Sequence, residues 1–101
     1  MKIYRSAAAI LDIIENAEYI AQDDLDAAIH FVDAVDRSIS LIAESPGIGA
    51  IRKVGNAPEM RMWAVKGFPS SLLFYRATST EIIVLRVIHS ARDFNQIFDN
   101  G

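Results

Sequence analysis

Four residues near the end of the chain have the types and spacing that chemistry would require. His89 and Arg92 lie three positions apart, directly after an apolar run, and Arg76 and Arg86 interrupt two apolar runs. An imidazole beside guanidinium groups could take part in proton transfer. Arginines set among large apolar side chains also suit a surface that recognises another protein. These residue types alone leave both alternatives open.

The remaining residues offer little other chemistry. His89 is interpreted as a strand-end residue that bonds to the loop backbone, with proton transfer as the alternative, and His30 as a solvated side chain. Cysteine is absent, which excludes a thiolate nucleophile, a disulfide and a cysteine-based zinc site. The sequence has neither a cluster of histidines and carboxylates at metal-binding spacing nor a glycine-rich phosphate loop. We therefore expect neither a metal nor a cofactor.

Charge is distributed unevenly along the chain. The net charge is −3 over 101 residues, but residues 1–50 hold nine acids against three bases, and residues 51–101 hold four acids against seven bases. An acidic partner or a nucleic acid is therefore expected to meet the second half. Asp12 and Glu15 interrupt the first apolar run, so neither a signal peptide nor a membrane helix is expected. The predicted location is the cytoplasm.

The first half of the chain predicts a strand and two helices. Residues 2–5 suit a short strand, and Ser6 suits the N-cap of a helix that carries Asp12 on its solvated side. A second helix is expected to be capped by Asp23 and to end at Glu44, ahead of a proline. The connection is so short that the helices should form an antiparallel hairpin. The apolar stripe predicted for the first helix contains Ala7, Leu11, Ile14 and Ala21.

The second half predicts a small antiparallel sheet, because the apolar period falls to two. The strands are expected at 61–66, 71–77 and 82–89, with a further short one at 51–54. The side chains expected to face the helices are Leu73, Tyr75, Ile83, Leu85 and Val87. The opposite parity carries Arg76 and Arg86 among Leu72, Phe74, Ile82, Val84 and Ile88. We interpret this face as a partner surface; the alternative is that a C-terminal element covers it while the arginines reach its rim.

A short C-terminal helix is expected to follow the sheet. Phe94, Ile97 and Phe98 lie at i, i+3 and i+4, and Ser90 and Asp93 have the spacing of a capping box. Trp63 is interpreted as a core or edge anchor. The whole chain, 1–101, is therefore predicted to be one α+β domain, in which an N-terminal strand and an antiparallel helix hairpin pack on a small antiparallel sheet.

The order of these elements and the closing segment, residues 85–93 (LRVIHSARD), resemble the RelE/ParE toxin superfamily, and more narrowly its ParE branch. Residues 44–49 (ESPGIG) and 73–76 (LFYR) add weaker similarity. The resemblance implies a RelE/ParE-like fold and the toxin of a bacterial type II toxin–antitoxin system. It also implies a ParD-like antitoxin that neutralises the toxin. RelE-like members cut mRNA on the ribosome, whereas ParE-like members inhibit DNA gyrase and are not nucleases.

The chain departs from the nuclease pattern at positions that matter chemically. Ser71 and Leu72 stand where nuclease members carry an arginine, residues 62–65 lack their lysines, and Phe98 replaces a reactive tyrosine, although Arg92 remains. The resemblance therefore implies a non-enzymatic inhibitor of gyrase, without membrane binding or direct DNA binding. The alternatives are a RelE-type ribosome-dependent mRNA endoribonuclease that uses His89 and Arg92, or an inactive homologue. The candidate antitoxin- or target-binding residues are Arg61, Trp63, Phe74, Arg76, Arg86, His89, Arg92, Phe94 and Phe98.

Overall fold

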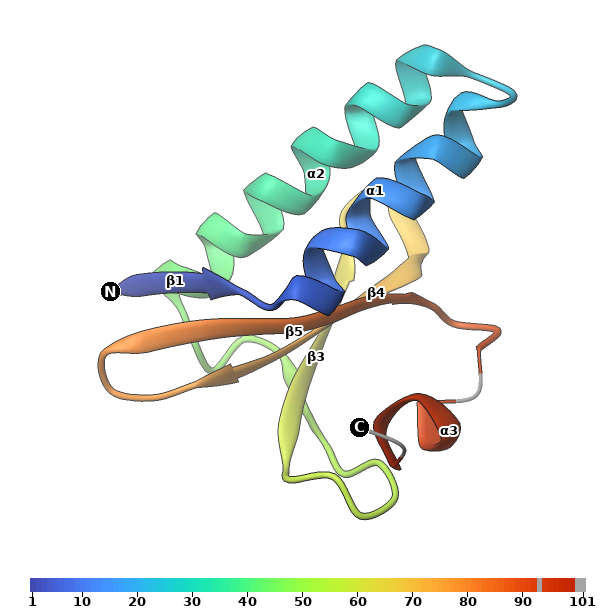
Figure 1. The fold of residues 1–101 in the computed structure, drawn as a ribbon. Helices are drawn as coiled ribbons and strands as arrows, with labels where there is room; N and C mark the ends of the chain where they lie inside the picture. The colour runs from blue at the N-terminus through green and yellow to red at the C-terminus, as the bar shows by residue number, and fades with distance from the viewer. Residues whose placement is uncertain (93, 100–101) are drawn as a thin grey trace.

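A hairpin of two helices packs on one face of a five-stranded mixed sheet, and a short helix lies near the other face (Figure 1). The computed structural model describes residues 1–92 and 94–99. In chain order the elements are β1 (Lys2–Arg5), α1 (Ala7–Ala21), α2 (Leu25–Glu44), β2 (Ala50–Arg52), β3 (Met60–Val65), β4 (Phe68–Ala77), β5 (Glu81–His89) and α3 (Phe94–Asp99). The predicted α+β fold, with its N-terminal strand, helix hairpin and sheet, is confirmed.

The sheet has the strand order β1-β5-β4-β3-β2, so the first strand lies beside the last. β1 pairs with β5 in parallel, and the other neighbours are antiparallel. The turn between β3 and β4 is tighter than predicted, because Gly67 adopts a positive φ of 85° and β4 already begins at Phe68. Similarly, β2 covers residues 50–52 rather than the predicted 51–54.

Polar side chains fix where the helices begin. The Ser6 hydroxyl accepts a hydrogen bond from the Ala9 amide at 3.0 Å, which confirms the predicted N-cap of α1. The cap of α2 is Asp24, whose carboxylate accepts from the Ala27 amide at 3.1 Å. The prediction of Asp23 as the cap is wrong, because the amide of Asp23 still bonds to the carbonyl of Ile20 in the last turn of α1.

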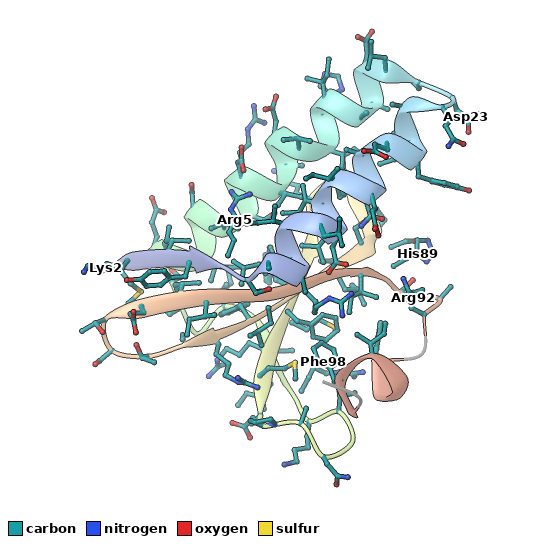
Figure 2. All side chains as sticks on the ribbon, in the orientation of Figure 1. Lys2, Arg5, Asp23, His89, Arg92 and Phe98 are labelled. Carbon is teal, nitrogen blue, oxygen red and sulfur yellow. The ribbon has the colours of Figure 1, made fainter. Side chains whose placement is uncertain are left out.

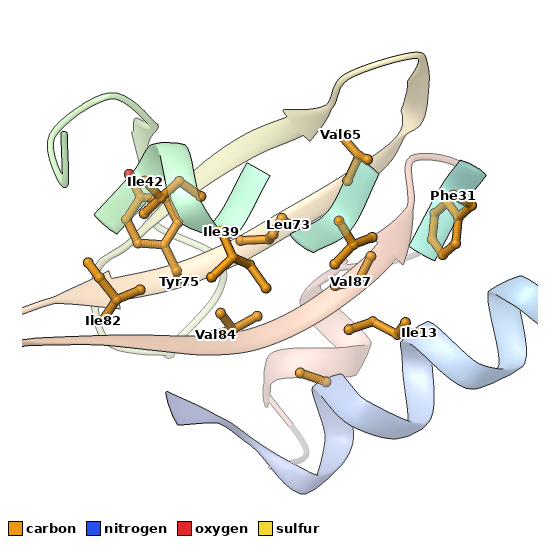
Figure 3. Packing of buried hydrophobic residues seen from close by; sticks show 12 residues of the cluster. Ile13, Phe31, Ile39, Ile42, Val65, Leu73, Tyr75, Ile82, Val84 and Val87 are labelled. Atoms are coloured by element: carbon orange, nitrogen blue, oxygen red, sulfur yellow. The ribbon is translucent and has the colours of Figure 1, made fainter. Parts of the chain in front are cut away.

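The main core lies between the helix hairpin and the sheet (Figure 3). Phe31 from α2 contributes an edge-to-face contact with Phe68, with ring centroids 5.2 Å apart. Complete burial of each large apolar side chain is worth roughly 1.5–3 kcal/mol. The cluster therefore holds the hairpin firmly on the sheet. Its largest fully buried members are Tyr75, Phe31, Ile42, Leu73 and Ile82.

A β-bulge on β5 changes which of its side chains face this core. Phe74 pairs with Arg86, but Tyr75 pairs with Val84, so Leu85 is an extra residue without a partner of its own on β4. The side-chain alternation is therefore reversed ahead of the bulge. Val84, together with Ile82, joins the helix-side core, and Ile83 and Leu85 lie outside it. The predicted positions of Leu73, Tyr75 and Val87 are correct, and those of Ile82, Ile83, Val84 and Leu85 are wrong.

The second face of the sheet is covered by α3. This agrees with the alternative that a C-terminal element covers the face that carries Arg76 and Arg86. Phe74 is completely buried, and its ring packs edge-to-face against Phe94 and Phe98 at centroid distances of 5.2 and 5.1 Å. Ile88 is buried in the same cluster. Of the predicted capping box, Asp93 lies outside the described residues.

Candidate protein-interaction site

The arginine on β5 is held by an acid from α1. Arg86 donates from Nε to Asp12 Oδ2 at 2.7 Å and from Nη2 to Asp12 Oδ1 at 2.9 Å, a bidentate pair. Asp12 Oδ2 also accepts from the Val87 amide at 3.0 Å, just after the bulge. The hydrogen bonds that Arg86 donates to the carboxylate of Asp12 raise the pKa of Arg86 above its ordinary value, although burial opposes this shift. Arg86 is therefore a permanently charged residue whose guanidinium is already engaged.

The same ion pair sets the rotation of α1. Asp12 is only 8% exposed and faces the sheet with Ala9 and Ile13, whereas Leu11 is 55% exposed. The predicted apolar stripe of α1, and the prediction that Asp12 lies on the solvated side, are therefore wrong. The exposed large apolar residues of α1 are Ile10, Leu11, Ile14 and Tyr19. One signal in the sequence could have indicated this pair. An acid lies within the apolar run of α1 and an arginine within the apolar run of β5, and two such opposite charges can form an ion pair when both runs are buried.

Arg61 holds the loop that follows α2. Its Nη1 donates to the carbonyls of Gly47 at 3.3 Å and Gly49 at 2.8 Å. In the same loop, the Tyr75 hydroxyl donates to the Pro46 carbonyl at 2.7 Å and accepts from the Gly49 amide at 2.9 Å. Arg61 on β3 thus has a structural role, because it holds the loop between α2 and β2. The periodicity of the sequence gave no indication of this role.

Arg76 lines a cavity of about 460 Å³ beside α3. Its Nε donates to the Glu59 carbonyl at 3.4 Å, a long hydrogen bond. Phe98 lines the cavity from α3, and Leu85, the extra residue of the bulge, lines it from β5. Among the side chains that the structure describes, Arg76 forms no ion pair. The cavity therefore combines apolar walls with a partly buried cation.

His89 is the last residue of β5, and Arg92 lies in the turn that follows; both are exposed (Figure 2). His89 Nδ1 accepts from the Ala91 amide at 3.0 Å, and the Arg92 amide donates to the His89 carbonyl at 3.0 Å. The interpretation of His89 as a residue that bonds to the loop backbone is confirmed. Trp63 is partly buried, packs against the main core and lines a hollow against α2, as expected of an anchor.

The candidate residues thus fall into separate places rather than one cluster. Phe74, Phe94 and Phe98 build the second core, while Arg76 and Arg86 line the cavity next to it. Arg61 and Trp63 lie at other parts of the sheet, and His30 is exposed on α2. Within residues 1–92 and 94–99 no three His, Asp or Glu side chains are grouped as metal ligands. In the same ranges, none of the helices has the length and apolar character that crossing a membrane requires.

The architecture is one that a solved toxin–antitoxin structure shares. A chain described as "Chromosomal ParDE TA system from P. aeruginosa" is similar with a TM-score of 0.71 and 18% sequence identity, over 88% of this chain and 95% of that one. No curated protein matches the sequence. Residues 3–94 match the model of a family described as the ParE toxin of the type II toxin–antitoxin system parDE. Because that match spans nearly the whole chain, the chain belongs to the ParE toxin family.

Proposed function

We propose that this chain is the toxin of a type II pair, that a ParD-like antitoxin neutralises it, and that it inhibits DNA gyrase by binding in the cytoplasm. The observation that carries the proposal is the family match over residues 3–94. The structurally similar chain from P. aeruginosa is part of a ParDE system, which supports an antitoxin of ParD type. Gyrase as the target follows from the ParE resemblance of the sequence.

The geometry favours binding over catalysis. Cleavage of RNA needs a base, an acid and cations gathered at one phosphate. In the described part of the chain, Nδ1 of His89 is occupied by a backbone amide and Arg86 is occupied by Asp12. Phe98 has no hydroxyl group to take part in proton transfer. These contacts support a protein that acts through its surface.

An apolar surface on α1 is the best candidate for contact with the antitoxin's apolar side chains. Ile10, Leu11 and Ile14 are 48%, 55% and 48% exposed, and Tyr4 on β1 is 46% exposed. Ile10, Leu11 and Ile14 lie in adjacent turns of α1, and exposed apolar residues that lie together commonly mark a partner site. We propose that the antitoxin covers them in the complex.

Expression with and without the neighbouring reading frame tests the proposal. We expect the toxin alone to arrest growth, the neighbouring gene to relieve the arrest, and purified toxin to inhibit supercoiling by gyrase. Codon-specific mRNA cleavage with normal supercoiling would instead establish a RelE-type nuclease. Overexpression without any growth defect would indicate an inactive homologue.

A charge placed on α1 tests the apolar surface. Leu11→Glu should weaken antitoxin binding at least tenfold in isothermal titration calorimetry, because a carboxylate would be desolvated in the interface. Ser40→Glu is the matched control, since it adds the same charge at an exposed position of α2. Equal affinities of the two variants would exclude this surface.

A further inference from the structure

The cavity beside α3 has an electrostatic character that the sequence does not reveal. Two arginines line it, Arg76 and Arg86, and in the part of the chain that the structure describes only Arg86 has an acidic partner. Asp12 engages Arg86 through two hydrogen bonds of 2.7 and 2.9 Å, so that pair has no net charge. Arg76 gives a single long hydrogen bond, to a backbone carbonyl, among the described residues. Among the described residues, the cavity therefore presents one positive charge without an acidic partner.

The remaining walls of the cavity are mostly apolar. Leu85 comes from the bulge of β5 and Ile97 from α3. Phe98 also comes from α3 (Figure 2). A volume of about 460 Å³ lies within the usual range of roughly 300–1,000 Å³ for ligand pockets. An arginine that is partly removed from water binds a carboxylate more strongly than an exposed one. Its planar fork also favours bidentate contact with that group.

We propose that this cavity is the anchor pocket for the antitoxin, and that it takes one acidic side chain with a large apolar side chain beside it. The carboxylate would bind the guanidinium of Arg76, and the apolar neighbour would contact Leu85 and Phe98. This inference rests on the proposed function, because it assumes an antitoxin partner. It goes further by assigning recognition to Arg76 and by assigning Arg61 and Arg86 to structure.

The contacts of the other arginines support this division. Arg61 is bound to two loop carbonyls, and Arg86 is bound to Asp12, so a partner's acid would have to displace existing contacts at either one. Arg92 lies in an exposed turn, where an ion pair contributes only about 0–1 kcal/mol. Arg76 alone among these four combines partial burial, a cavity and an uncompensated charge in the described structure.

The test uses the full-length toxin and synthetic peptides that tile the C-terminal half of the protein encoded by the neighbouring reading frame. Affinity is measured for wild-type toxin, Arg76→Gln and Arg52→Gln. Arg52 is the matched control, because it is exposed on the edge strand β2 and the substitution removes the same charge. We expect Arg76→Gln to lower the affinity for the peptide that binds by roughly 30-fold or more, because a desolvated charge pair would be lost. Arg52→Gln should lower the same affinity by about threefold or less, because Arg52 is exposed.

A double-mutant cycle identifies the acid and also guards against misfolding. Each acidic residue of the binding peptide is changed to its amide and titrated against wild-type toxin and against Arg76→Lys, which retains the charge but loses the fork. Changing one particular acid of the peptide should account for most of the loss in affinity for wild-type toxin. The same change should cost less affinity when the toxin carries an Arg76 substitution. If wild-type toxin binds and Arg76→Gln binds as Arg52→Gln does, the pocket is excluded while the proposed function survives. If no peptide and no intact neighbouring protein binds wild-type toxin, the proposed function itself fails, and the pocket with it.

Discussion

Removal of the Asp12 carboxylate should reveal how strongly the buried ion pair contributes to stability. Asp12→Ala leaves Arg86 without its partner and the Val87 amide without its acceptor. Loss of one member of a buried pair costs about 3–5 kcal/mol. The Arg86 side chain is 25% exposed, which lets water compensate in part, so we expect about 2–3 kcal/mol. That is a large fraction of the roughly 5–15 kcal/mol that stabilises an ordinary domain.

The chain supplies its own control for this experiment. Arg5 and Asp36 form a second ion pair, at 2.6 Å, but the two side chains are 34% and 55% exposed. Asp36→Ala should therefore change the free energy of unfolding by about 1 kcal/mol or less. Both variants are compared with wild type by urea unfolding monitored by circular dichroism. Equal losses in the two variants would refute the claim that burial makes the Asp12 pair special.

Two substitutions and one truncation test the other contacts. Tyr75→Phe should destabilise the protein by about 1–3 kcal/mol in thermal unfolding, because it leaves the buried amide of Gly49 without an acceptor. Gly49→Ala should destabilise it by about 1–3 kcal/mol, since the new Cβ would lie 2.7 Å from the Tyr75 hydroxyl oxygen, whereas Gly47→Ala meets open space and should be close to neutral. A stop codon after Arg92 should remove the cover from Phe74 and increase the fluorescence of a dye that binds apolar surface; unchanged fluorescence would contradict the packing of α3.

Much of the architecture could be predicted from the sequence because the apolar periods are strong. The second helix follows from its 3.6-residue period and from the proline two residues after its end, and the hairpin follows from the short connection between the two helices. The strands follow from their alternation. The bulge at Leu85 could not be predicted from periodicity. It adds one residue without any marker such as glycine, and it reverses the side-chain faces ahead of it.

The site was harder to predict than the fold, for a physical reason. The role of an arginine depends on which acid or carbonyl lies within hydrogen-bonding distance of it, and those partners are distant in the sequence. Arg86 and Asp12 are 74 residues apart, and Arg61 binds carbonyls 12 and 14 residues away. The sequence showed which residues were candidates, and only the tertiary contacts separated the arginine at the cavity from those that hold the fold.

The pairing of β1 with β5 also constrains how this protein can be made. Lys2–Arg5 finds its partner only in residues 81–84, so the sheet cannot close until most of the chain has been synthesised. Contacts over such long sequence separations make folding slow compared with a helical bundle of equal size. A fragment that ends before β5 should therefore remain unfolded when it is isolated, and protease digestion would test this. If so, a growing chain can complete this sheet only near the end of translation.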